Sequence, residues 1–205
     1  MSVRFGTFDK SFRRQIGIPN FNRTYTCMCW IFLEEEHPTV GQQTQAFQVA
    51  PAVEIPNFVN ESDILRMRKI NSTTTVLQLT ADHVGPLEFS SFGTTPLVIN
   101  RWYHLAMVRY NQRALTAYID GEAEVSIIDD VGTVRQLPSF FILAGHGGTN
   151  FKISRLVSAI KVWNQALSRR QIKSEMVRIR PVQFNNLNTF APVFPGVNER
   201  AKDYS

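Results

Sequence analysis

Two consecutive apolar segments, joined by a short polar connection and followed by an Asp-Gly pair, constrain the fold of this chain more than any other feature. Residues 102–110 and 115–119 are aromatic, β-branched or aliphatic at successive positions, and the gap of four residues between them suits a short hairpin loop. Because apolar side chains on both faces of a strand must all be buried, we expect central strands of a packed sheet. Asp120-Gly121 supplies the positive φ that a second tight turn needs, so residues 122–128 should form the next strand.

Short apolar segments recur along the rest of the chain, separated by Pro, Gly, Asn or Asp. Residues 24–33 are apolar at both alternating sets of positions, which predicts another central strand. Further strands are predicted at residues 46–53, 64–70, 74–80, 87–92, 140–143 and 156–163. The chain has 205 residues, of which 11% are aromatic and 19% charged, so it can bury a sizeable core. We expect a single domain over residues 1–205.

One segment predicts a helix. Ser168 is a favourable N-cap, and Gln171 three residues later completes a capping box. Leu167 and Ile172 occupy the two positions of a hydrophobic staple. The next proline stops the helix. These signals predict one short accessory α-helix near residues 168–179.

Two cysteines and a histidine lie inside predicted strands. Cys27 and Cys29 should point to the same face of a strand with Cα atoms about 6.5 Å apart, a poor geometry for a disulfide between them. We expect two buried free thiols, because a metal site would need further soft ligands and the chain has no other cysteine. His104 lies in the first strand of the hairpin and is expected to be packed.

Five short motifs follow one another along the chain. They are Trp102-Tyr103-His104-Leu105-Ala106-Met107-Val108, Tyr118-Ile119-Asp120-Gly121, Leu143-Ala144-Gly145, Ala159-Ile160-Lys161-Val162-Trp163-Asn164 and Ala166-Leu167-Ser168. In their order and spacing they resemble the motifs of laminin-G-like domains, which belong to the concanavalin A-like lectin/glucanase superfamily, and the resemblance covers roughly residues 24–176. It implies an all-β, antiparallel jelly-roll β-sandwich of two curved sheets. The superfamily includes glycan binders, glycosidases and adhesion or structural modules, so the fold does not determine the function.

A pair of catalytic carboxylates would indicate a glycosidase. The glucanase branch carries Glu-x-Asp-x-x-Glu on one strand, because a retaining enzyme needs two carboxylates about 5 to 5.5 Å apart. The nearest match is residues 61–66, where Arg66 replaces the last acid. Asp120, Glu122 and Glu124 alternate along the chain, but they straddle the predicted Asp-Gly turn. We therefore expect no catalytic residue and no enzymatic activity.

Polar loops at the ends of the sandwich are the predicted ligand-binding sites. His146, Thr149 and Asn150 follow a Gly-rich stretch and offer donors and acceptors of the kind that bind sugar hydroxyls. Asp82 and His83 form a similar small group. The alternative for both groups is a plain connection between strands.

No cofactor is predicted for this chain. Many relatives of the fold bind Ca²⁺ near such loops, through Asp, Asn and backbone carbonyl oxygens. Asp82, Asp120, Asp129 and Asp130 could contribute oxygens of this kind, but the sequence places no two of them together. A metal site is therefore left unassigned.

Positive charge is concentrated in residues 151–180, which contain eight basic residues and one acid and so carry +7 in a chain of net charge +5. Such a segment is compatible with an anionic partner such as a sulfated glycan, a nucleic acid or an acidic protein surface. We favour the alternative that these side chains are simply solvated, and no reading helix or stacking platform indicates specific nucleic-acid binding. The predicted basic patch consists of Arg155, Lys161, Arg169, Arg170 and Lys173.

Two functional hypotheses from different classes follow. The first is a non-catalytic carbohydrate-binding module that uses the sandwich loops. The second is a structural or adhesion module, such as a virion surface decoration or assembly protein. Residues 1–21 and 182–205 lack clear periodicity, and such arms often order against a neighbouring subunit, which predicts a homo-oligomer or an assembly.

The N-terminal residues lack the uninterrupted apolar stretch of a secretory signal, and no segment approaches the roughly eighteen apolar residues of a membrane span. We expect synthesis in the cytoplasm, with a glycan or a protein surface as the partner.

Overall fold

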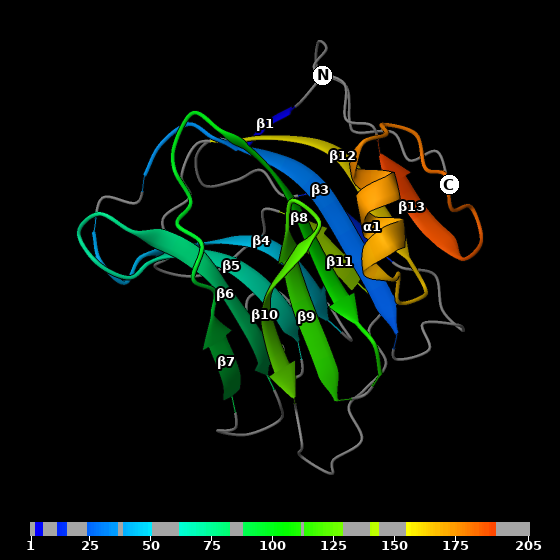
Figure 1. Ribbon diagram of the computed structural model, residues 1–205, viewed down its shortest axis with the longest axis horizontal. Coiled ribbons are helices and arrows are strands. Elements are labelled where there is room, and N and C mark those ends of the chain that lie inside the picture. The colour runs from blue at the N-terminus through cyan, green and yellow to red at the C-terminus, as the bar shows by residue number, and fades with distance from the viewer. Residues whose placement is uncertain are drawn as a thin grey trace.

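Two antiparallel sheets pack face to face in the computed structural model, which describes residues 3–5, 12–15, 24–36, 39–50, 62–82, 88–111, 113–128, 140–143 and 155–191 (Figure 1). The seven-stranded sheet has the order β1-β12-β3-β8-β9-β10, with β13 also paired to β12. Its strands are β1 Val3–Phe5, β12 Arg155–Trp163, β3 Tyr25–Leu33, β8 Trp102–Arg109, β9 Ala114–Ile119, β10 Glu122–Ile128 and β13 Leu187–Ala191.

The six-stranded sheet has the order β2-β11-β4-β5-β6-β7. Its strands are β2 Phe12–Gln15, β11 Phe140–Leu143, β4 Gln43–Ala50, β5 Asp63–Lys69, β6 Thr75–Asp82 and β7 Glu88–Phe92. One short helix, α1 Arg169–Met176, lies on the outer face of the seven-stranded sheet. The predicted all-β, antiparallel β-sandwich with one accessory helix is therefore confirmed.

The core fills the space between the two sheets. Strand β3 contributes alternate side chains to it, including Cys27 and Cys29, which are both free and fully buried. Burial raises the pKa of Cys27 well above its usual range, so this thiol stays protonated. The prediction of two buried free thiols is confirmed.

The Asp-Gly turn has the predicted conformation. Asp120 and Gly121 have φ values of 51° and 78°, and β9 and β10 pair across them. The carboxylate of Asp120 accepts a hydrogen bond from the His104 N–H at 2.8 Å, and the Asp120 N–H donates to the His104 carbonyl at 2.8 Å. These bonds fix the turn against β8.

The accessory helix begins as predicted. Ser168 is the N-cap, and it forms a reciprocal capping box with Gln171. Leu167 and Ile172 are fully buried, and they pack in a second apolar cluster that includes Trp163 of β12. This cluster attaches α1 to the outer face of the seven-stranded sheet.

The helix ends at Met176, before the predicted end near residue 179. Side chains of the sheet beneath bind its terminal carbonyl groups: the buried Lys161 donates to the Glu175 carbonyl at 2.8 Å, and the half-buried Trp30 donates to the Met176 carbonyl at 3.1 Å. Ile179, which the sequence places near the end of the helix, lies outside it and is 63% exposed.

Three short strands were not predicted, and all lie in the proposed terminal arms. β1 and β13 pair with β12, and β2 pairs with β11. These segments of residues 1–21 and 182–205 therefore pair within the chain's own sheets.

Candidate functional site

The loop residues predicted to bind a ligand lie mostly outside the described part of the chain. His146, Thr149, Asn150 and His83 belong to segments that the structure does not describe. Asp82 is the last residue of β6, where its backbone pairs with Glu88. These five residues remain a prediction.

The acidic residues around the Asp-Gly turn each have a structural partner. Asp120 accepts from the His104 N–H and from Arg101, while Glu122 pairs with Lys173 and Arg169 of α1. The bond from Lys173, followed by the charge of Arg169, lowers the pKa of this exposed Glu122 carboxyl. Among the described residues, no group of three or more His, Cys, Asp or Glu side chains could hold a metal ion.

Asp63, from the segment that partly matches the glucanase motif, lies in the core. Its carboxylate pairs with the Arg109 guanidinium, whose Nε donates to Oδ2 at 2.9 Å, and it accepts a hydrogen bond from the Tyr25 hydroxyl. All three residues are at most 5% exposed. Burial, followed by the charge of Asp63, raises the pKa of Tyr25 well above its usual range, so the hydroxyl stays protonated and donates. Asp63 therefore cross-links three strands inside the sandwich.

Polar side chains cover part of the outer face of the six-stranded sheet. The register of β4, β5, β6 and β7 places amide and guanidinium groups on this face, opposite the side that contacts the core. We call this set the polar sheet face. Its members are Gln43, Gln45, Gln48, Arg66, Arg68, Gln78 and Phe92.

One aromatic ring lies in the polar sheet face. Phe92 is 45% exposed, and the Arg68 guanidinium lies 5.6 Å from its ring centroid. Arg68 also donates to the Gln78 side chain at 3.3 Å, and Gln45 donates to Gln48 at 2.8 Å. Arg68 and Gln45 are thus each held by a neighbouring glutamine, whereas the buried Gln43 Oε1 has no hydrogen-bond partner within the described segments. Phe92 offers a ring surface beside these groups.

This arrangement can contact a ligand that has both apolar and hydroxyl-bearing faces. The polar sheet face was not identified from the sequence, although Gln43 and Gln45, and Arg66 and Arg68, each alternate along one strand. Such alternation indicates that one face of a strand is polar. Only the pairing of β5, β6 and β7 shows that Phe92 shares this face with Arg68.

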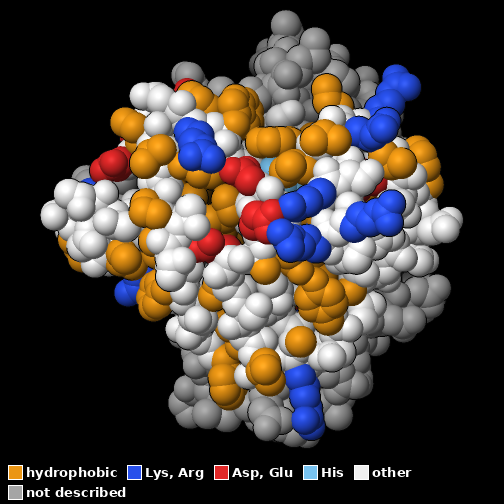
Figure 2. All heavy atoms as spheres, in the orientation of Figure 1, with side chains coloured by type: hydrophobic (Ala, Val, Ile, Leu, Met, Phe, Trp, Pro, Cys, Tyr) orange, Lys and Arg blue, Asp and Glu red, His pale blue; other side chains and the backbone are white. Residues whose placement is uncertain are grey.

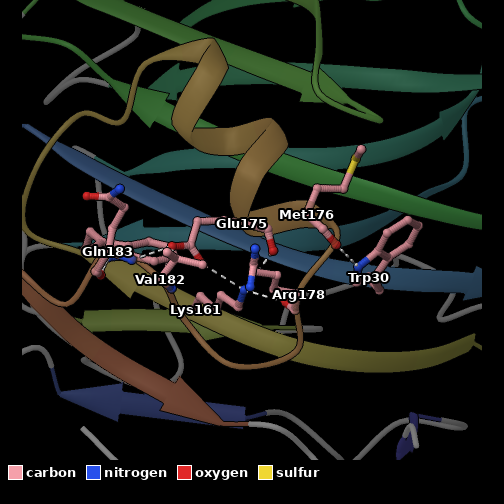
Figure 3. A network of polar contacts seen from close by, with 8 residues as sticks. Trp30, Lys161, Glu175, Met176, Arg178, Val182 and Gln183 are labelled. Atoms are coloured by element: carbon pink, nitrogen blue, oxygen red, sulfur yellow. Dashed lines mark hydrogen bonds and ion pairs between the residues drawn. The ribbon is translucent and has the colours of Figure 1, made fainter.

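Lys161 does not belong to a basic surface patch, contrary to the prediction, because its side chain is buried. It is 1% exposed, and its ammonium group binds the Glu175 carboxylate at 2.9 Å and the Arg178 carbonyl at 2.7 Å (Figure 3). Burial lowers the pKa of Lys161, and the bond to Glu175 opposes this change. Treating Lys161 as a surface cation was therefore wrong, because its charge is needed to neutralise Glu175 under the helix.

Of the other four predicted members of the patch, three are exposed on α1, and the side chain of the fourth lies outside the described part of the structure. Arg169 and Lys173 are exposed on α1 and share Glu122 as an ion-pair partner, and Arg170 is exposed beside them. Figure 2 shows acidic and basic side chains in contact on this face of the molecule. Arg155 begins β12, and its side chain is outside the described part of the structure.

His104 is packed beneath the helix, as predicted. It is 2% exposed, its ring lies edge-on to Trp30 with a centroid distance of 5.3 Å, and its Nδ1 has no hydrogen-bond partner within the described segments. Burial, followed by the positive charge of Lys161, lowers the pKa of His104 from 6.5 to about 3.

His104 should make the protein less stable in mild acid. Between about pH 3 and pH 6.5 the unfolded chain binds a proton at this ring and the folded chain does not, so stability rises with pH in that window. We expect this residue to account for a loss of about 2 kcal/mol between pH 7 and pH 5. Urea unfolding at both pH values should show a smaller loss in His104→Gln. An equal loss in the two proteins would contradict the prediction.

Comparisons with known proteins agree with this architecture. A family model described as the concanavalin A-like lectin/glucanases superfamily matches residues 15–173. A search of curated proteins found no match. Among solved structures, the receptor binding domain of botulinum neurotoxin D has a TM-score of 0.60 at 10% identity, over 83% of this chain and 42% of that chain.

Two further structures are similar over most of the chain. A heptameric SAP-like pentraxin from Limulus polyphemus has a TM-score of 0.54 at 17% identity, over 78% of this chain and 72% of that chain. A candidate carbohydrate binding protein from Bacteroides ovatus has a TM-score of 0.58 at 18% identity, over 93% of this chain and 51% of that chain. The chain spans less than half of the neurotoxin domain, and at these identities the likeness is one of fold.

Proposed function

Because the chain belongs to the concanavalin A-like lectin/glucanases superfamily, we propose that it is a non-catalytic binding module whose ligand is a carbohydrate. Similarity to receptor-binding and candidate carbohydrate-binding proteins supports a binding role. The observation that carries the carbohydrate proposal is Phe92, a ring that is 45% exposed beside Arg68, on a face that also carries the half-buried Gln45.

A sugar ring matches this surface chemically. Its C–H groups pack against an aromatic ring, and its hydroxyls both donate and accept hydrogen bonds. Gln45 is half-buried on the same face, and its amide group carries both a donor and an acceptor. The loops that contain His146, Thr149 and Asn150 are proposed as a second contact region.

The non-catalytic part of the proposal is supported by the roles of the described carboxylates. Asp63 is buried against Arg109, and Glu122 is paired with two residues of α1. Glu124 accepts hydrogen bonds from the Thr94 and Thr95 backbone N–H groups. We expect no release of reducing sugar from β-glucans.

The binding site is tested by titrating the glycan that binds best in an array screen into matched variants. Phe92→Ala should weaken binding about tenfold, because it removes the stacking surface and leaves the sheet backbone unchanged. Phe184→Ala is the control, since Phe184 is 69% exposed on the α1 side of the molecule. A double alanine variant at His146 and Asn150 tests the loop region. Thermal melts should confirm that all variants are folded.

The variant that loses affinity identifies the region that binds the glycan. Loss of affinity in Phe92→Ala alone supports the polar sheet face, and loss in the loop variant alone moves the site to the loops. Equal affinity in every variant contradicts both locations. If no glycan binds and the protein forms a stable oligomer, the structural or assembly function replaces the carbohydrate proposal.

A further inference from the structure

The connection that follows α1 exposes apolar side chains to solvent. Val177, Ile179 and Phe184 are 73%, 63% and 69% exposed, and Val182 is 41% exposed. Exposed apolar residues are ordinary when they are scattered singly, but four within eight consecutive residues form a patch that needs an explanation. We call the exposed side chains of residues 169–184 the helix-side surface.

Buried side chains hold the backbone of this connection in place (Figure 3). Lys161 donates to the Arg178 carbonyl, and the Glu175 carboxylate accepts from the Val182 and Gln183 N–H groups at 2.7 and 2.6 Å. Trp163 donates to the Gln183 carbonyl at 2.6 Å. Because the polar anchors all lie underneath, the apolar side chains are presented outward on a fixed loop and not on a loose one.

The charges within the helix-side surface are positive, and two of them, on Arg169 and Lys173, pair with the neighbouring exposed Glu122. Arg170, Arg178 and Arg180 are exposed, and Arg178 and Arg180 alternate with the apolar residues of the connection. The one acid between residues 164 and 191 is Glu175, which is 1% exposed and paired with Lys161. Figure 2 shows basic and apolar side chains next to each other over α1 and the connection after it.

We propose that the helix-side surface docks on an anionic lipid surface. The apolar side chains would insert among the acyl chains near the headgroups, and the arginines would bind the lipid phosphates. A single short helix covers the sheet here, and no helix in the described segments is long and apolar enough to span a membrane, so the contact would be peripheral. The proposal goes beyond carbohydrate binding and does not depend on it.

The pattern favours a bilayer over a protein partner. Val177, Ile179, Val182 and Phe184 follow neither the helical nor the strand period, so they do not form a ridge that fits a groove or an edge that extends a sheet. A fluid bilayer can accommodate apolar side chains that have no regular spacing. It requires apolar side chains with basic ones around them, and both are present.

Sedimentation with vesicles made of phosphatidylcholine, with or without phosphatidylserine, tests the proposal. These lipids carry no sugar, so the result is independent of glycan binding. The full chain should bind the phosphatidylserine vesicles and bind neutral ones at least about tenfold more weakly. The double variant Ile179→Ser with Phe184→Ser should reduce binding about tenfold or more, and so should Arg178→Gln with Arg180→Gln.

Two control variants test whether vesicle binding depends on the helix-side surface or on exposed apolar side chains elsewhere. Ile128→Ser changes an aliphatic residue that is 75% exposed at the far end of β10, and Phe92→Ala changes the polar sheet face. Both should bind vesicles like the unchanged protein. Failure to sediment with any vesicle, or equal binding to neutral vesicles, would overturn the proposal. A concentration-dependent dimer that Phe184→Ser abolishes would assign the surface to a second copy of the chain and would also overturn it.

Discussion

Replacing Glu175 with alanine should lower the free energy of unfolding by about 3 to 5 kcal/mol. Glu175 is 1% exposed, and one of its carboxylate oxygens binds Lys161 while the other accepts two backbone N–H groups after the helix. Without it, the buried Lys161 ammonium group keeps two backbone carbonyl acceptors but loses its carboxylate partner, and two backbone donors lose their acceptor. Urea unfolding monitored by circular dichroism measures the loss.

A second variant distinguishes the charge from the hydrogen bonds. Glu175→Gln retains one acceptor for Val182 and Gln183 but no longer neutralises Lys161, so we expect a loss close to that of the alanine variant. Glu36→Gln is the control, because Glu36 is 45% exposed and its contact with the largely buried Lys69 is long, at 3.5 Å. That change should cost less than about 1 kcal/mol. A Glu175→Ala protein as stable as the Glu36→Gln protein would show that the pair does not hold the connection.

Replacing Asp63 with alanine should have an effect of similar size, about 3 to 5 kcal/mol, in the core between the sheets. The Arg109 guanidinium would be left without its carboxylate, and the Tyr25 hydroxyl would lose an acceptor. Because β3, β5 and β8 meet at these three residues, the loss should appear in the cooperative unfolding of the whole sandwich. Equilibrium denaturation by urea and by heat measures it.

A double variant that removes both charges tests whether the loss in Asp63→Ala comes from a buried charge that is no longer neutralised. The double variant Asp63→Leu with Arg109→Met removes both charges of this pair from the core, so it should be more stable than Asp63→Ala alone. If the double variant is less stable than the single one, the ion pair would have to contribute directly and not only through the cost of removing the Asp63 carboxylate from the buried Arg109. A loss below about 1 kcal/mol in Asp63→Ala would contradict the burial of the pair.

Much of the fold could be predicted because its signals are local. The turn at Asp120 and the cap at Ser168 each depend on residues within a few positions of one another. Strand β3 is apolar on both faces because one face meets the core and the other meets α1. These patterns can be recognised in the sequence without knowledge of any long-range contact.

Other features depend on residues far apart in the chain. β1 and β2 are three and four residues long, and they are strands because β12 and β11 pair with them from more than a hundred residues away. Lys161 carries no sign of burial in its own segment, since lysine is usually exposed, and its partner lies fourteen residues later. The polar sheet face depends on the register of four strands, so it could not be assembled from the sequence alone.

A glycan array probed with the full chain tests the proposed function most directly. We expect saturable binding to at least one class of glycan, with affinity about tenfold lower for Phe92→Ala and unchanged for Phe184→Ala. An array without saturable binding to any glycan would contradict the proposed function.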